Sequence, residues 1–145
     1  MKLILKLKNI FFREMIADVG SKVKNLKIFE VYEASLTHFI LYAFSGTLST
    51  LTEISIYKPK MSPSAFERIC TECLSLKKLC LQMKSTGDCL EHVSKLKELE
   101  QFHLIFWDST TSVNMSLFRN WLSSTIKDLC LENLTGINLQ VRWVR

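Results

Sequence analysis

A short apolar pattern recurs along the chain and constrains its fold more than any other feature. The pattern is an apolar residue, two variable residues, a second apolar residue, one variable residue and a third apolar residue. Its five full copies are Leu26-x-x-Phe29-x-Val31, Leu51-x-x-Ile54-x-Ile56, Leu76-x-x-Leu79-x-Leu81, Leu99-x-x-Phe102-x-Leu104 and Ile126-x-x-Leu129-x-Leu131. A weaker copy near the N-terminus has Lys2 in the first position, followed by Leu5 and Leu7. The copies begin near residues 2, 26, 51, 76, 99 and 126, which is a repeat of about 25 residues.

Each copy is followed by a segment suited to a helix. The alternating end of the pattern predicts a strand, and apolar residues three and four positions apart then predict a helix. Ser62-Pro63 supplies an N-cap and a first-turn proline to the helix whose apolar face carries Phe66, Ile69, Cys70, Cys73 and Leu74. Other helices are predicted over 11–19, 36–44 and 114–122, and from the Asp88-x-x-Glu91 capping box to Leu96. Gly20 and Gly46 follow the first two, where a left-handed cap is favoured.

These units predict how the chain folds as a whole. One strand and one helix cannot bury their apolar faces alone, whereas neighbours in a parallel array can. We therefore expect an α/β fold, a right-handed βα solenoid of about five to six irregular repeats, with a curved parallel sheet inside and helices outside. Residues 1–145 form one segment of this solenoid, without a polar cap before the first strand. The tail, 135–145, contains a strand-like alternation and is expected to cap the last repeat.

The later copies resemble a known repeat family. Leu76-Lys-Lys-Leu79-Cys-Leu81, Leu99-Glu-Gln-Phe102-His-Leu104 and Ile126-Lys-Asp-Leu129-Cys-Leu131 are similar to ribonuclease-inhibitor-like, cysteine-containing leucine-rich repeats. They are most similar to the irregular repeats of F-box proteins, and the cysteine shortly before Leu76 adds to the likeness. The resemblance covers about residues 2–134 and implies a protein-binding solenoid. By analogy it implies substrate selection for an SCF-type (cullin–RING) ubiquitin ligase, although no F-box is visible in the chain.

The chain departs from this family at one position of each repeat. Such repeats usually carry Asn or Cys three residues after the last strand leucine, where the side chain bonds the turn backbone. The residues at these places are Ile10, Ala34, Pro59, Lys84, Trp107 and Leu134. A regular side-chain ladder is therefore not expected.

The sequence does not favour an enzyme or a metal site. It contains no nucleophile elbow, P-loop, dinucleotide fingerprint or His-Glu-x-x-His motif. Cys70 and Cys73 are predicted on a buried helix face and Cys80 in a strand, so they are expected to be structural rather than zinc ligands. Cys80 and Cys130 hold equivalent strand positions two repeats apart, about 10 Å, which is too far for a disulfide. We expect no catalytic residue, metal or cofactor.

The inner, concave face of the sheet is the expected binding site for another protein. The strand residues that point to this face carry both charges and two tyrosines, which suits protein recognition. The candidate binding residues are Glu30, Tyr32, Glu53, Tyr57, Lys78, Gln82, Gln101 and His103. The alternative function is a regulatory or inhibitor-type repeat protein that masks an enzyme or receptor.

Charge and cysteine usage narrow the class of partner and the compartment. The net charge of +5 comes from scattered lysines and arginines, so neither nucleic acid nor membrane is the expected partner. Five cysteines and no signal peptide favour reduced thiols in the cytoplasm or nucleus. Two glycosylation sequons, Asn114-Met-Ser116 and Asn133-Leu-Thr135, leave an extracellular repeat protein as a weaker alternative.

Overall fold

A computed structural model describes residues 2–6, 13–32, 41–57, 63–83, 87–106, 125–133 and 138–142. The predicted helix over 114–122 and the six family-specific turn positions lie outside these ranges. The strands are β1 (Lys2–Lys6), β2 (Ile28–Tyr32), β3 (Glu53–Tyr57), β4 (Lys78–Met83), β5 (Gln101–Phe106), β6 (Asp128–Asn133) and β7 (Asn138–Arg142). The helical elements are α1 (Arg13–Lys22), the 3-10 helix η2 (Ser45–Thr50), α3 (Pro63–Glu72) and the 3-10 helix η3 (Gly87–Lys95).

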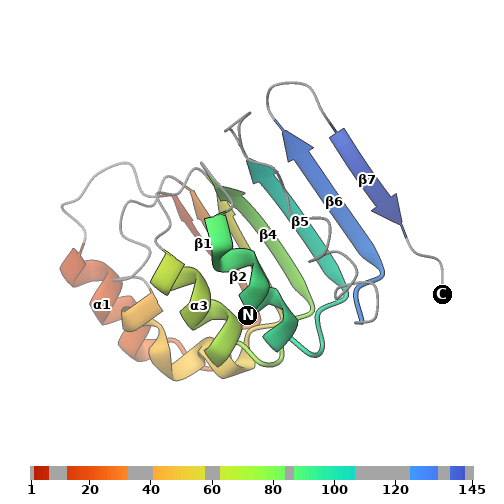
Figure 1. The fold of residues 1–145 in the computed structure, drawn as a ribbon. Helices are drawn as coiled ribbons and strands as arrows, with labels where there is room; N and C mark the ends of the chain where they lie inside the picture. Colours follow the sequence, from red (N-terminus) through yellow and green to blue (C-terminus); the bar gives the residue numbers. More distant parts are fainter. Residues whose placement is uncertain are drawn as a thin grey trace.

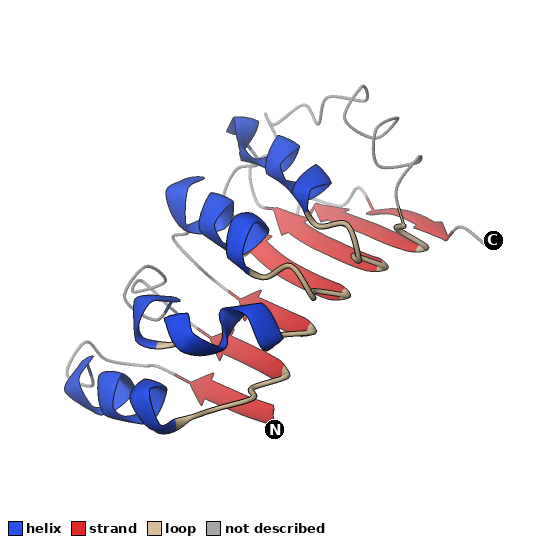
Figure 2. Cartoon of the chain, turned by 90° about the horizontal axis from the view of Figure 1, so that it is seen from below, coloured by secondary structure: helices blue, strands red, loops and turns tan. Residues whose placement is uncertain are grey.

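The strands form one open sheet in which their order is the order of the chain (Figure 1). Strands β1 to β6 are parallel, and β7 pairs antiparallel with β6. The helical segments all lie on one face of this sheet (Figure 2). The α/β class with a parallel sheet is thus confirmed, and the tail contains the predicted strand.

The apolar pattern aligns from strand to strand. The middle residue of each copy lies beside the middle residue of the next, in the order Phe29, Ile54, Leu79, Phe102 and Leu129. This register points the pattern residues at the helices. Those whose side chains are described are at most 3% exposed: Leu26, Phe29, Leu51, Ile54, Ile56, Leu76, Leu79, Leu81, Leu99, Phe102, Leu104, Ile126 and Leu129. The predicted core is confirmed at these positions.

The first repeat has a different register from the one predicted. Leu3 and Leu5, rather than Leu5 and Leu7, lie beside Phe29 and Val31. Leucines occupy every second position here (Leu3, Leu5 and Leu7), and a shift of two residues leaves the same side chains on the same face of a sheet. The apolar pattern alone therefore could not distinguish the two registers.

Glycine caps do not end the first two helical segments. Helix α1 continues to Lys22, so Gly20 lies inside it, and Gly46 lies inside η2. Asn25, in the turn that leads into β2, has a positive φ of 59°. It is the one non-glycine residue of the described ranges with a positive φ. Gly20 has another role, because a Cβ built on it would be 2.3 Å from the carbonyl oxygen of Ala43. Only glycine allows the two backbones to approach this closely.

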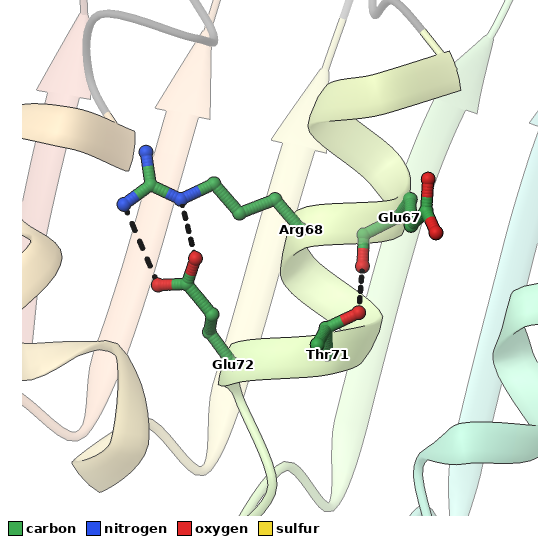
Figure 3. Close-up of polar contacts among 4 residues, drawn as sticks. All are labelled: Glu67, Arg68, Thr71 and Glu72. Atoms are coloured by element: carbon green, nitrogen blue, oxygen red, sulfur yellow. Dashed lines mark hydrogen bonds and ion pairs between the residues drawn. The ribbon is translucent and has the colours of Figure 1, made fainter.

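Helix α3 lies between η2 and η3 (Figure 1). Polar contacts between residues four positions apart link its successive turns (Figure 3). The Arg68 guanidinium donates to Glu72 through Nε (2.7 Å) and Nη2 (3.4 Å). On the side toward η3, the carboxylate of Glu67 lies 3.6 Å from the ammonium of Lys95. The apolar face of α3 packs in the core, where Phe66, Ile69 and Cys70 are fully buried.

Two details of the predicted helices are wrong. Leu74 is 58% exposed, because α3 ends at Glu72 and Leu74 lies in the following turn. The segment that begins near Asp88 is a 3-10 helix rather than an α-helix. Val93 within it and Leu96 just after it are both buried and three positions apart, which matches the three residues per turn of a 3-10 helix.

Two leucine substitutions test where the core ends. Leu79→Ala empties a buried site and should lower the free energy of unfolding by about 2–5 kcal/mol. Leu74→Ala removes the same atoms from an exposed turn and should change it by less than about 0.5 kcal/mol. Urea unfolding followed by circular dichroism measures both. Equal losses would show that Leu74 belongs to the core.

A pair of glycine substitutions tests the close approach at Gly20. Gly20→Ala places a methyl group against the Ala43 carbonyl and should destabilise the protein by about 1–3 kcal/mol. Gly46→Ala meets no atom within 4 Å and should be neutral or stabilising by up to about 1 kcal/mol. Thermal unfolding of the two variants gives the comparison. A Gly20→Ala protein as stable as the wild type would contradict the contact.

Candidate protein-binding face

The open face is the side of the sheet opposite the helices. No described helix or strand lies over it (Figure 2). A row of four polar residues crosses this face where strands β3 to β6 begin. Each is the first residue of its strand, and the row reads Glu53, Lys78, Gln101 and Asp128. Two residues further along, Ser55, Cys80, His103 and Cys130 form a second row. The predicted alternation between core and outward residues therefore places polar side chains together in rows.

A hollow of about 340 Å³ lies on this face. Its polar lining comes from the starts of β4, β5 and β6, namely Lys78, Gln101, His103 and Asp128, with Cys130 beside them. Leu79 and Phe102 contribute to its lining. Nε2 of His103 is buried, whereas Lys78 and Gln101 are exposed. A ligand group in this hollow would meet an ammonium group, an amide and a carboxylate.

The structure brings together three of the eight predicted binding residues. Lys78, Gln101 and His103 line the hollow, and Glu53 lies next to Lys78 in register. Tyr32 and Tyr57 are neighbours at the other end of their strands, and Tyr57 is half-buried. Gln82 is half-buried on β4, and the side chain of Tyr32 is outside the described part.

Glu30 is engaged within the protein. Its carboxylate lies 2.9 Å from the ammonium of Lys2, on the neighbouring strand β1. By contrast, Glu53, Lys78 and Gln101 make no side-chain hydrogen bond or ion pair with any described residue. Of the predicted binding residues whose side chains are described, those available to a partner are therefore Glu53, Lys78 and Gln101, on β3 to β5.

A second hollow, of about 440 Å³, lies at the edge where β4 to β6 begin, and was not predicted from the sequence. It is lined by Lys77, Lys97, Glu98, Glu100, Thr125 and Lys127. Most of these residues lie in the turns before the strands, where an apolar pattern carries no information on side-chain grouping. The sequence held one signal of this hollow, the pair Lys77-Lys78. Lys78 is the first residue of β4, so Lys77 is the last residue of the turn before it.

The cysteines occupy separate environments. Cys70 and Cys73 are buried against the helix-side face of the sheet, and Cys80 is on the open face. The four cysteines whose side chains are described, Cys70, Cys73, Cys80 and Cys130, are not in disulfides. No cluster of three metal-ligating side chains occurs within the described ranges.

Among the helices in the described ranges, none has the length and apolar content needed to cross a bilayer. Comparison of the chain with family models, with curated proteins and with solved structures gives no match.

The thiol of Cys73 predicts a pH dependence of stability. Burial, together with the neighbouring Glu72 carboxylate, raises the pKa of Cys73 from 9.0 to about 12. At a pH between these two pKa values, Cys73 loses its proton in the unfolded chain but keeps it in the folded protein. This group therefore lowers the free energy of unfolding as pH rises from about 9, by at most about 1.4 kcal/mol per pH unit.

Urea unfolding at pH 8, 9 and 10 should show a steeper loss of stability in the wild type than in Cys73→Ala. Ionisation of lysines and tyrosines is common to both proteins and cancels in this difference. Parallel pH profiles would contradict the raised pKa.

Proposed function

We propose that the chain is a βα solenoid of the leucine-rich-repeat type that works as a protein-binding module without enzymatic activity. The consecutive strand order and the single helical layer support this architecture, since doubly wound α/β folds carry helices on both faces of the sheet. The strand starts recur at 28, 53, 78, 101 and 128, close to the sequence period. In such an array each unit packs mainly on its neighbours.

The open face is the proposed recognition surface. The observation that carries the proposal is a group of three polar side chains: Lys78 and Gln101 line the 340 Å³ hollow, and Glu53 lies beside Lys78 in register. None of the three has a side-chain partner among the described residues. Both charges and a neutral amide are present within neighbouring strands, about 4.8 Å apart. A protein surface supplies matching charges and hydrogen-bonding groups in comparable density.

The biological role that we propose is substrate selection for an SCF-type ubiquitin ligase. It rests on the resemblance of the repeats to those of F-box proteins, and the open face would hold the substrate. The sheet is rigid, because each strand is hydrogen-bonded to its neighbours along its length, so the face is preformed for a partner.

Affinity capture with mass spectrometry tests the surface and the role separately. The tagged full-length product is compared with a Glu53→Ala/Lys78→Ala variant and with a Glu91→Ala/Lys24→Ala control, which changes exposed residues away from the open face. We expect the first variant to lose a specific partner that the control retains, and ligase subunits to be captured in all three.

The outcomes are distinct. Identical partners in the three captures would overturn the open face as the recognition surface. If the partner depends on Glu53 and Lys78 but no ligase subunit is captured, the ligase role is wrong and the protein-binding function stands. In that case, inhibition of a captured enzyme by the purified chain would favour a masking role.

A further inference from the structure

The two hollows share the starts of the same three strands. The hollow on the open face is lined by Lys78, Gln101 and Asp128, and the hollow at the edge by the residues immediately before them, Lys77, Glu100 and Lys127. Because these residues are consecutive in the chain, the hollows adjoin along the edge of the sheet. A single extended segment can therefore contact both.

Unpaired charge in these hollows is mainly positive. Lys77, Lys78 and Lys97 are exposed and make no side-chain hydrogen bond or ion pair within the described residues. Of the lining carboxylates, Glu100 is paired with Lys127 at 3.1 Å, and Asp128 makes an interaction of its own. Glu98 is the remaining one without a described partner. Among the lining residues, three available ammonium groups thus face one available carboxylate, and Glu53 adds a second carboxylate beside Lys78.

We infer that this edge, which we call the lysine edge (Lys77, Lys78 and Lys97 with the two hollows), docks an acidic segment of a partner protein. The inference rests on the proposed protein-binding function and names the chemistry of the partner. An ammonium group can donate hydrogen bonds to a carboxylate in many directions, so three of them suit a flexible acidic peptide. Gln101 adds a neutral amide donor inside the first hollow.

A peptide fits the lysine edge better than a nucleic acid does. Single-stranded nucleic acid is bound by a cationic groove with aromatic side chains on which the bases stack. The aromatic rings that line these hollows are those of Phe102, which is 1% exposed, and His103, whose Nε2 is buried, so neither offers an open stacking platform. Glu98 and Glu100 would also repel a continuous phosphate backbone, whereas a peptide can place its carboxylates apart from them.

Fluorescence anisotropy with a defined probe tests the inference. The probe is a labelled ten-residue peptide of alternating Glu and Ser, compared with the same peptide carrying Gln in place of Glu. The protein variant is Lys77→Glu/Lys97→Glu. The matched control is Lys24→Glu/Lys27→Glu, which makes the same charge change at exposed lysines that line neither hollow.

We expect the Glu peptide to bind and the Gln peptide not to bind. The Lys77/Lys97 variant should bind the Glu peptide about tenfold more weakly, since each exposed ion pair contributes up to about fivefold. The control should weaken binding less than about threefold, through net charge alone. Raising the salt concentration should weaken wild-type binding because the charges are exposed to screening.

Three results would overturn the inference: equal binding of the Gln peptide, equal loss in the two variants, or tighter binding of a labelled ten-nucleotide RNA than of the Glu peptide at the same salt. The proposed function fails separately. If partner capture depends on Glu53 and Lys78 while the Glu peptide does not bind, the protein-binding function stands and the lysine edge is wrong. If the peptide binds as expected but no captured protein depends on Glu53 and Lys78, the open face is wrong as the recognition surface and the lysine edge stands as a site for acidic peptides.

Discussion

Paired backbone hydrogen bonds at the strand starts hold each unit to the next. The carbonyl oxygens of Lys27, Thr52, Lys77 and Glu100 each accept two consecutive N–H groups from the next turn, over distances of 2.7–3.0 Å. Threonine hydroxyls reinforce two of these turns, since Thr50 donates to the carbonyl of Leu26 and Thr125 to that of Leu99. Sheet register, the buried rows and the position of both hollows all depend on these connections.

Because the carbonyl groups belong to the backbone, the side chains at these positions can vary. Lysine, threonine and glutamate all occupy the accepting position, and their side chains point away from the core. The turns can thus carry lysines and glutamates while the connection between units stays the same. The charge of the lysine edge is in this way independent of the bonds that hold the sheet together.

The sequence predicted the strands and the core well, because burial of one sheet face requires apolar residues at fixed spacing. The prediction was wrong where two different structures fit the same apolar pattern. The alternating leucines of β1 allow two registers, and buried residues at three-residue steps fit both an α-helix and the 3-10 helix η3. Gly20 was assigned to a cap because a sequence shows that a glycine is present but not which backbone approaches it.

The candidate site was predicted only in part, for a related reason. Alternation along the strands places Lys78, Gln101 and His103 on one face, and the structure groups them at one hollow. Whether a charge is available depends on contacts between repeats, such as that of Glu30 with Lys2. Lys97 and Lys127 come from turns about 30 residues apart in the chain, and only the strand register brings them to one hollow.

The contact between Gly20 and Ala43 also bears on the shape of the sheet. Parallel strands lie about 4.8 Å apart, whereas packed helices usually need 8–10 Å, so an array with helices on one face bends around its strands. A glycine at the contact lets the helical layer close up, which reduces the bend needed between the first two units. A larger residue at position 20 would push the two helical segments apart and so increase the bend required of the sheet beside β1 and β2.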